Sequence, residues 1–401
     1  MIDDPLALAE LLHAAPTRLV YEFAGAGVGA LATLHAAAGS SRTLLEATDR
    51  YAAGSLEEGV GEAVAQAVSP EVAVALAQRA RARARRLADA DESVAGVAVT
   101  ATIATDRRKR GEHRVWGAAA DGLGVRLLGV TLRKGGRDRS GEERVVSSVA
   151  LRLMAEAKGV MRHLVLGLRD DEPLVAEFRP GPELAAFEVG HREVLAIDAS
   201  GRVVDVLPWA AAGGGMPDAG SPARVGATGG AIVSGAFHPL HDGHLGLASA
   251  AQRHLGLPVA FELAVANADK PTIPLADAHR RAAQFAGRAP LLLTRVPRFD
   301  QKAALLPHTV FVIGADTAAR VLEDRFYPEP DGLDAAMAAM REAGGRFLVA
   351  GRRMGRGFLT LADLPVPPRH ADLFEALPAA AFRADVSSSD IRTAWARGGA
   401  G

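Results

Sequence analysis

Apolar residues follow two different periods along the first 160 residues. Ala, Val and Leu recur at helical spacing from Glu71 to Leu87 and again from Glu142 to Lys158. Between these segments, Val94 to Ile103 is a β-branched run typical of a buried strand. Helical and strand patterns that alternate in this way predict an α/β fold.

The pattern changes after residue 160. Short alternating stretches at Leu174–Phe178, Glu193–Ile197 and Arg202–Leu207, with a turn at Asp198–Gly201, predict a small β-hairpin element. From Ala210 to Gly230 the chain is rich in Gly, Ala, Pro and Ser without apolar periodicity, which favours a flexible linker. We therefore expect an N-terminal domain (1–160), a β element with the linker (161–228) and a C-terminal domain (229–401).

The C-terminal domain opens with a strand that leads directly into a helix. Ala231–Val233 has the pattern of a short buried strand, and Leu245–Leu255 has helical spacing. The turn between them, Gly235 to His244, contains three histidines. In an open α/β sheet ligands bind beyond the carboxyl ends of the strands, where a helix N-terminus offers free amides to phosphate.

Composition and charge narrow the function classes. The 401 residues carry a formal net charge of -1, so no global field attracts nucleic acid or an anionic membrane. The absence of cysteine excludes disulfides and thiolate nucleophiles and leaves His, Asp and Glu as strong metal ligands. No basic start precedes an apolar run and no apolar run approaches a membrane span, so we expect a cytoplasmic protein.

The turn carries the chemistry of a phosphate site. His241 and His244 are three residues apart at a helix start and therefore lie on one side of it, while Gly243 lets a phosphate approach the backbone. Such a pair can donate hydrogen bonds to phosphates as charge builds on them. His238, His241 and His244 could alternatively form a metal triad, but no carboxylate partner for them is evident and Pro239 restricts the backbone.

This turn resembles the signature of the nucleotidyltransferase superfamily that includes the nicotinate- and nicotinamide-mononucleotide adenylyltransferases. The pattern of that family is Gly-x-Phe-Asn-Pro-x-His-x-Gly-His. The chain matches it at Gly235, Phe237, Pro239, His241, Gly243 and His244, and it has His238 where the family has Asn. The resemblance implies a Rossmann-like parallel sheet.

Three further segments resemble the same family in the same order. Ala266–Pro271 is similar to the segment that supplies a phosphate-binding lysine, here Lys270, and Gly314–Thr317 is similar to the Gly-Ala-Asp segment that contacts the nucleotide. Val386–Arg392 resembles the Ile-Ser-Ser-Thr-x-Ile-Arg motif, in which hydroxyls, helix amides and an arginine hold phosphate. The resemblance thus assigns Gly314 and Asp316 to the nucleotide, and Ser387, Ser388, Ser389 and Arg392 to ATP phosphates.

The resemblance implies transfer of AMP from ATP to nicotinamide or nicotinate mononucleotide. His241, His244 and Lys270 are then the catalytic residues, and Gly235, Phe237, His238 and Gly243 join the nucleotide-binding set. Mg²⁺ is expected on the ATP phosphates rather than on protein ligands. Two alternatives stay open: transfer to another phosphorylated acceptor such as phosphopantetheine, and a non-catalytic nucleotide sensor. The expected partners are ATP and a mononucleotide, without nucleic acid or membrane.

Leu6 to Lys158 resembles the C-terminal domain of the CinA family, which includes nicotinamide-mononucleotide deamidases. The resemblance runs through Glu22–Ser41, Tyr51, Ala67–Ala73 and Val97–Thr102. The family's catalytic serine is missing from Glu22–Gly27, and Leu56 falls near the place of its lysine. Because amide hydrolysis then lacks a nucleophile and a base, we expect an inactive domain that serves homo-oligomerisation or ligand sensing.

Overall fold

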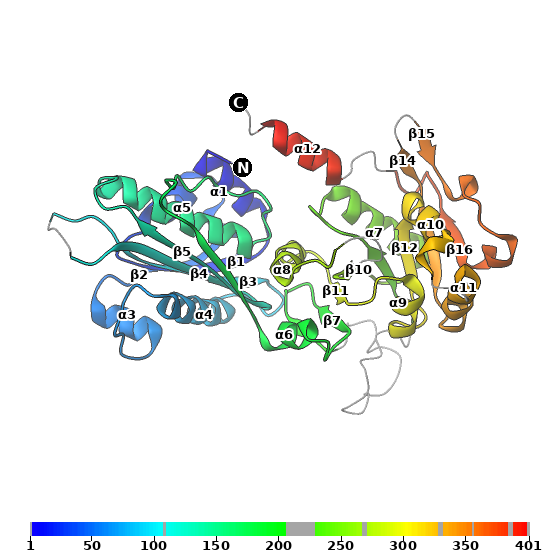
Figure 1. The fold of residues 1–401 in the computed structure, drawn as a ribbon, viewed down its shortest axis with the longest axis horizontal. Coiled ribbons are helices and arrows are strands. Elements are labelled where there is room, and N and C mark those ends of the chain that lie inside the picture. Colours follow the sequence, from blue (N-terminus) through cyan, green and yellow to red (C-terminus); the bar gives the residue numbers. More distant parts are fainter. Residues whose placement is uncertain are drawn as a thin grey trace.

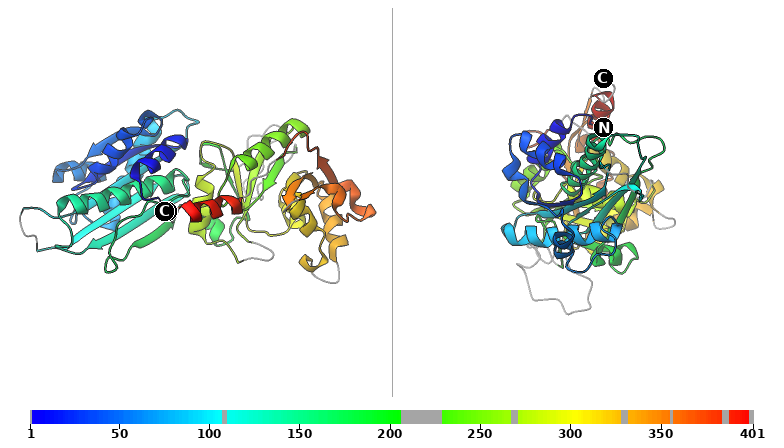
Figure 2. Two further views of the ribbon diagram at one scale, coloured as in Figure 1. Left: turned by 90° about the horizontal axis from the view of Figure 1, so that it is seen from above. Right: turned by 90° about the vertical axis from the view of Figure 1, so that its left-hand side faces the viewer.

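The computed structural model describes residues 2–106, 110–205, 229–266, 271–327, 332–354, 357–383 and 388–398. These residues form two lobes, each built on a β-sheet with helices packed against it (Figure 1). The expected α/β class is thereby confirmed. Helix α12 (Ser388–Gly398) lies at one edge of the molecule, over the junction of the two lobes (Figures 1 and 2). None of the described helices is long and apolar enough to cross a membrane.

The first lobe contains a six-stranded sheet in the order β2-β1-β3-β4-β5-β6, parallel from β2 to β3 and antiparallel from β3 to β6. Helices α1, α2 and α5 cover one face, and α3 and α4 cover the other (Figure 1). The strands are β1 (Arg18–Ala24), β2 (Leu44–Asp49), β3 (Val94–Thr102), β4 (His113–Ala120), β5 (Gly124–Leu132) and β6 (Val175–Pro180). The helices are α1 (Pro5–Ala14), α2 (Val28–Ala36), the 3₁₀ helix η1 (Ser40–Arg42), α3 (Ala53–Val60), α4 (Pro70–Leu87) and α5 (Arg139–Ala157).

The arginine-rich helix α4 shows how the sequence determines an element of this lobe. Ser69 caps it by accepting the amide of Val72 at 3.2 Å, and Pro70 fits the first helical position. One face of it is buried against the sheet through Val72, Ala73, Leu76, Ala77, Ala80 and Ala84. Arg83 instead points outward and pairs with Glu46 on β2 at 2.7 Å. The predicted helix at 71–87 and strand at 94–103 are confirmed.

The second lobe contains an eight-stranded sheet in the order β16-β13-β12-β9-β10-β11-β7-β8. Its six strands from β9 onward run parallel, and in chain order they are arranged 3-2-1-4-5-6, which is the Rossmann arrangement. The strands are β7 (Val194–Ile197), β8 (Val203–Val204), β9 (Ala231–Ser234), β10 (Val259–Ala264), β11 (Leu291–Thr294), β12 (Val310–Gly314), β13 (Arg346–Ala350) and β16 (Phe374–Leu377), with a separate hairpin of β14 (Arg352–Met354) and β15 (Gly357–Leu359). The helices are α6 (Pro182–Glu188), α7 (Asp242–Leu255), α8 (Leu275–Ala283), α9 (Phe299–Leu305), α10 (Ala315–Val321), α11 (Gly332–Glu342) and the 3₁₀ helices η3 (Asp324–Phe326), η4 (Leu361–Asp363) and η5 (Pro368–Leu373).

The strands that the sequence groups into one small β element are divided between the two sheets. The β7–β8 hairpin forms as expected, with Ala196 opposite Val204, but β7 also pairs with β11 and so extends the second sheet. Strand β6 pairs with β5 and closes the edge of the first sheet. Each strand gains backbone hydrogen bonds from an open sheet edge, which a free hairpin could not supply. Residues 206–228, which include most of the predicted linker Ala210–Gly230, lie outside the described residues.

Candidate active site

A cavity of about 860 Å³ opens at the carboxyl ends of the parallel strands in the second lobe. It lies where β9 and β12 meet, which is the point where the strand order of the sheet reverses. The amino ends of α7 and α12 also reach its wall. This is the position at which open α/β sheets bind nucleotides.

The two histidines of the signature turn cap helix α7 together. Nδ1 of His241 accepts the amide of Gly243 at 3.1 Å, and Nδ1 of His244 accepts the amide of His241 at 3.3 Å. The ring centroids are 3.9 Å apart. Both rings line the cavity, so the spacing of three residues places them on one side of the helix start, as predicted.

These hydrogen bonds determine which nitrogen carries the proton. A ring nitrogen that accepts an amide is unprotonated, so in a neutral ring Nε2 is the donor. Burial lowers the pKa of His241, with Arg352 adding to the effect. Burial, His241 and Arg352 together lower the pKa of His244 to about 3. At neutral pH the cavity therefore contains two uncharged Nε2–H donors.

The low pKa of His244 predicts a pH dependence of stability. The unfolded ring binds a proton below pH 6.5 and the folded ring only near pH 3, so the stabilisation is complete above pH 6.5 and is lost as the pH falls toward 3. The free energy of unfolding should fall by up to about 1.4 kcal/mol per pH unit on this account. Urea unfolding between pH 7 and pH 4 should show a shallower pH slope for His244→Phe than for the wild type. An unchanged slope would contradict the assignment.

Phe237 anchors the turn in the core. Its ring packs against Phe261, Phe285 and His244 with centroids 5.5, 5.0 and 5.0 Å away, and the side chain is fully buried. Its backbone lies in the left-handed region at φ 45°, an unusual conformation for a bulky residue that the packing holds in place. A Cβ at Gly235 would lie 2.8 Å from the Phe237 ring, so only glycine fits there.

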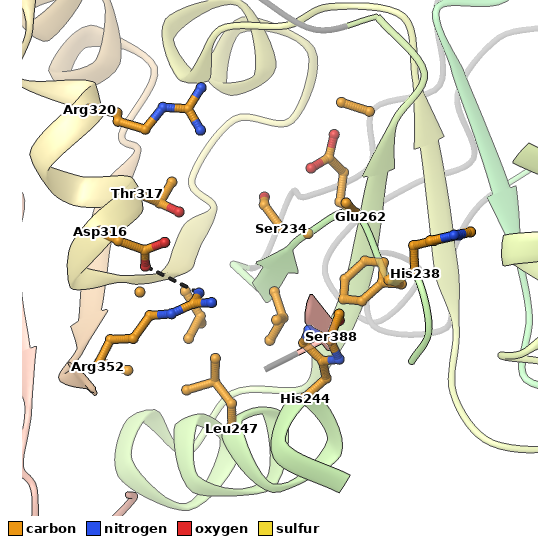
Figure 3. A pocket seen from close by; sticks show the side chains of 18 of the residues that line it. Ser234, His238, His244, Leu247, Glu262, Asp316, Thr317, Arg320, Arg352 and Ser388 are labelled. Carbon is orange, nitrogen blue, oxygen red and sulfur yellow. Dashed lines mark hydrogen bonds and ion pairs between the residues drawn. The ribbon is translucent and has the colours of Figure 1, made fainter. Parts of the chain in front are cut away.

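His238 takes a different position from the two catalytic candidates. It belongs to the cavity wall, but its ring points away from Asp316 and Arg352 (Figure 3). Its Nδ1 is buried without a hydrogen-bond partner among the described residues. Burial lowers the pKa of His238, and Arg281 adds to the effect. His238 thus contributes mainly its backbone carbonyl, which accepts from Arg392.

The amino end of α12 is tied to the signature turn. Ser388 donates to the carbonyl of Pro239 at 3.0 Å, and Arg392 bridges the His238 carbonyl and the Ser389 hydroxyl. These contacts bring the C-terminal serine and arginine motif to the same cavity as the histidine pair. Lys270 and Ser387 lie outside the described residues, so their predicted roles stay predictions.

Asp316 and Arg352 form an ion pair on the opposite side of the cavity, as Figure 3 shows. Their Oδ1 and Nη1 atoms are 3.2 Å apart. A Cβ at Gly314 would lie 2.6 Å from the Asp316 carboxylate, which explains the glycine before it. Asp316 can still accept from a ribose hydroxyl through its other oxygen, since a carboxylate has several lone pairs.

A buried ion pair forms another part of the wall. Nζ of Lys302 on α9 lies 3.0 Å from Oε2 of Glu262 on β10, and both side chains are at most 5% exposed. The Thr294 hydroxyl donates to the second carboxylate oxygen of Glu262. The pair therefore presents a neutralised polar surface rather than a free charge.

The electrostatic balance of the cavity favours an anionic ligand. Among the described residues, its wall holds the cationic side chains of Arg281, Arg298, Lys302, Arg320, Arg352 and Arg392, against the carboxylates of Glu262 and Asp316. Both carboxylates are engaged by cations. The described part of the chain contains no group of three His, Asp or Glu side chains arranged to hold a metal ion, so the alternative metal triad is not supported.

The structure brings together every described residue that the sequence assigned to the site. These are Gly235, Phe237, His238, His241, Gly243, His244, Gly314, Asp316, Ser388, Ser389 and Arg392, all of which line the one cavity. Sequence reasoning missed Arg352, the Glu262–Lys302 pair and Gln284, which binds the turn from behind. Of these residues, only Arg352 could have been found from the sequence, because it directly follows Gly351 at the end of an apolar strand pattern.

Residues 232–394 match the cytidylyltransferase-like family. The match begins in β9, includes the other strands of the Rossmann-type sheet and extends into the helix that carries Ser388 and Arg392. It supports a nucleotidyltransferase activity for this part of the chain. No curated protein sequence is significantly similar to the chain.

Solved structures of competence-damage proteins show similarity over a further part of the chain. A competence/damage inducible protein from Agrobacterium tumefaciens is 19% identical over 38% of this chain and 96% of its own, with a TM-score of 0.29. CinA superfamily proteins from Escherichia coli and Enterobacter cloacae are 20% and 18% identical. They cover 37% and 39% of this chain and 83% and 92% of their own, with TM-scores of 0.28 and 0.31. At these values nothing about activity follows.

Proposed function

We propose that residues 229–401 catalyse transfer of AMP from ATP to nicotinamide or nicotinate mononucleotide. The observation that carries this proposal is the pair of neutral Nε2–H donors, His241 and His244, in a cation-lined cavity at the switch point of the sheet. Such donors suit phosphate oxygens on which charge develops during transfer. The choice of a mononucleotide as the acceptor rests on the resemblance of the turn to the mononucleotide adenylyltransferases.

The reaction is an in-line displacement. An oxygen of the mononucleotide phosphate attacks the α-phosphorus of ATP and forms the new phosphoanhydride bond. The bond from that phosphorus to the oxygen it shares with the β-phosphorus breaks, and pyrophosphate leaves with the bonding electrons. The attacking phosphate is already ionised at neutral pH, so no general base is needed. Catalysis then depends on positioning and charge stabilisation.

Different residues of the cavity are proposed to bind and stabilise the phosphates from different sides. The histidine pair donates to the phosphate chain at the start of α7, and Ser388 and Arg392 approach it from the start of α12. Lys270 is proposed as a further phosphate ligand on the basis of the resemblance alone. The engaged carboxylates Glu262 and Asp316 do not fit a resident metal site, so Mg²⁺ is proposed to arrive with the triphosphate as part of the substrate.

For the first lobe we propose a role without catalysis of its own. At the start of α2, the carboxylate of Glu143 accepts the amides of Gly27 and Gly29 at 2.9 and 3.1 Å. The chain's own anion thus occupies the helix start beside Glu22–Gly27, the segment that lacks the family's serine. Leu56, near the place of the missing lysine, is a buried core residue of α3. Homo-oligomerisation and ligand sensing are the proposed alternatives for this lobe.

A second candidate is transfer of a cytidylyl group or transfer to another phosphorylated acceptor. The description of the matched family as cytidylyltransferase-like supports this alternative. According to the resemblance, the same histidine turn serves both cytidylyl and adenylyl transfer. The sensor alternative requires that ATP binds without turnover.

A set of incubations with different substrates separates adenylyl transfer from cytidylyl transfer and from the sensor alternative. The purified full chain with ATP, Mg²⁺ and one of the two mononucleotides should release pyrophosphate and form the dinucleotide, detected by mass spectrometry. CTP in place of ATP should give no product, and the mononucleotide alone should release no ammonia. A preference for CTP would favour the second candidate, and ATP binding without release would favour the sensor. Ammonia release would overturn the inactive first lobe.

A further inference from the structure

Helix α8 lies at the junction of the two lobes (Figure 1) and contacts both the first lobe and the signature turn. On one side, Nε2 of His279 lies 2.6 Å from Oδ2 of Asp121, in the turn between β4 and β5 of the first lobe. The His279 side chain is 1% exposed, and its ring packs on Phe178 with centroids 4.4 Å apart. Arg126 of β5 donates to the carbonyl of Ala276 at 3.2 Å. The first lobe therefore contacts α8 at two positions, Ala276 and His279.

The opposite side of α8 holds the backbone of the signature turn. Arg281 donates to the carbonyl of Ala236 at 3.0 Å, and Asp277 orients its guanidinium. Just beyond the helix, the Gln284 amide donates to the carbonyl of Phe237 at 2.9 Å and accepts the amide of Leu240 at 2.8 Å. Gln284 is 6% exposed and so has few alternative partners. It spans the segment that leads to His241.

The helical period explains how one short helix serves both sides. Residues 277, 281 and 284 are spaced by four and three and share the face toward the turn. Residues 276 and 279 are spaced by three and share the face toward the first lobe. Movement of α8 on the first lobe would therefore displace the groups that hold the turn.

A second contact reaches Gln284 directly. Gly159, just after α5 of the first lobe, has φ 66°, and a Cβ there would lie 2.5 Å from the backbone of Gln284. The absence of a side chain lets the end of α5 lie against this backbone. Leu123, beside Asp121, is buried in the same apolar cluster as Phe237 and Phe285. The first lobe thus packs into the core that supports the turn.

We propose that the first lobe holds the signature turn in its active geometry through α8, with Gln284 and the Asp121–His279 contact as positioning residues. Gln284 fixes the turn, and Asp121 with His279 fixes α8. The effect on turnover rests on the proposed nucleotidyl transfer, whereas the effect on the order of the turn does not. This gives the first lobe a role in the second lobe's site without chemistry of its own.

The test compares two matched substitutions in the full chain. His279→Phe keeps an aromatic ring against Phe178 but removes the donor to Asp121. His370→Phe removes another buried histidine, whose side chain is 5% exposed, from Asp334, 2.7 Å away on the far side of the second lobe. Amide hydrogen exchange of residues 235–247 should accelerate about tenfold in His279→Phe and stay unchanged in His370→Phe. His279→Gln, which restores an N–H donor, should recover much of the protection.

Turnover provides a second readout. In His279→Phe and in Gln284→Met, kcat for nucleotidyl transfer should fall about tenfold to a hundredfold, with KM for ATP changed less than about threefold. If His279→Phe does not fold, Asp121→Asn provides the same comparison, since it keeps the oxygen that accepts the amides of Leu123 and Gly124.

The outcomes separate the two proposals. Unchanged exchange of the turn in folded His279→Phe and Asp121→Asn would overturn the positioning role, and so would equal acceleration in His370→Phe. Protection that depends on His279 in a protein without any nucleotidyl transfer would sustain the positioning role while the proposed function fails.

Discussion

His244→Ala should lower kcat for nucleotidyl transfer by about 10²- to 10³-fold, as measured by pyrophosphate release at saturating ATP and mononucleotide. The substitution removes one of the two Nε2–H donors in the cavity and also the ring that accepts the His241 amide. Both losses act at the phosphate-binding end of α7. The donor matters more in the transition state, when charge moves onto the leaving pyrophosphate, so KM for ATP should change much less than kcat.

His254→Ala is the matched control for this experiment. His254 lies in the last turn of the same helix and bonds to Glu375 at 2.7 Å, far along α7 from the cavity wall. The control should keep wild-type turnover. Turnover that survives in His244→Ala would contradict the catalytic assignment and would favour the sensor alternative, provided that ATP still binds.

The signature turn could be located from the sequence because its chemistry is contiguous. A buried strand, a turn with glycines and histidines, and a helix follow one another without interruption from Ala231 to Leu255. The period of the apolar residues identifies the strand and the helix, and the turn must then lie at the strand's carboxyl end. The same local logic places Gly314 and Asp316 after β12 and Ser388 before α12. These local patterns were sufficient to predict most of the residues that line the cavity.

The supporting contacts could not be predicted because they join distant residues with no local pattern. Gln284 meets Leu240 across 44 positions, and Lys302 meets Glu262 across 40. Glutamine or lysine in a short amphipathic helix is ordinarily a surface residue, so composition gives no sign that these two are buried. Only the packing of helices on the finished sheet decides which polar side chains enter the core. The same limit explains why β6 and β7 were not assigned to separate sheets, since strand pairing is a long-range choice.

The Glu262–Lys302 pair leads to the second large prediction, which concerns stability. Lys302→Met should lower the free energy of unfolding by about 3–5 kcal/mol, because it leaves the Glu262 carboxylate buried without its cation. The hydroxyl of Thr294 alone cannot compensate a buried charge. Urea unfolding followed by far-UV circular dichroism at pH 7 measures the change. The matched surface control is Arg341→Met, which breaks the exposed pair with Asp372 and should leave the midpoint unchanged.

The double variant Glu262→Gln/Lys302→Met distinguishes the lost charge partner from lost packing. Glutamine still accepts the Thr294 hydroxyl but carries no charge, and methionine keeps much of the volume of lysine. The double variant should therefore recover more than half of the stability that Lys302→Met loses. If both variants are equally unstable, the contact of the Lys302 ammonium with the Phe299 ring, 4.8 Å from its centroid, matters more than the ion pair with Glu262. Recovery would mean that the buried charge left without its partner, rather than lost packing, destabilises Lys302→Met.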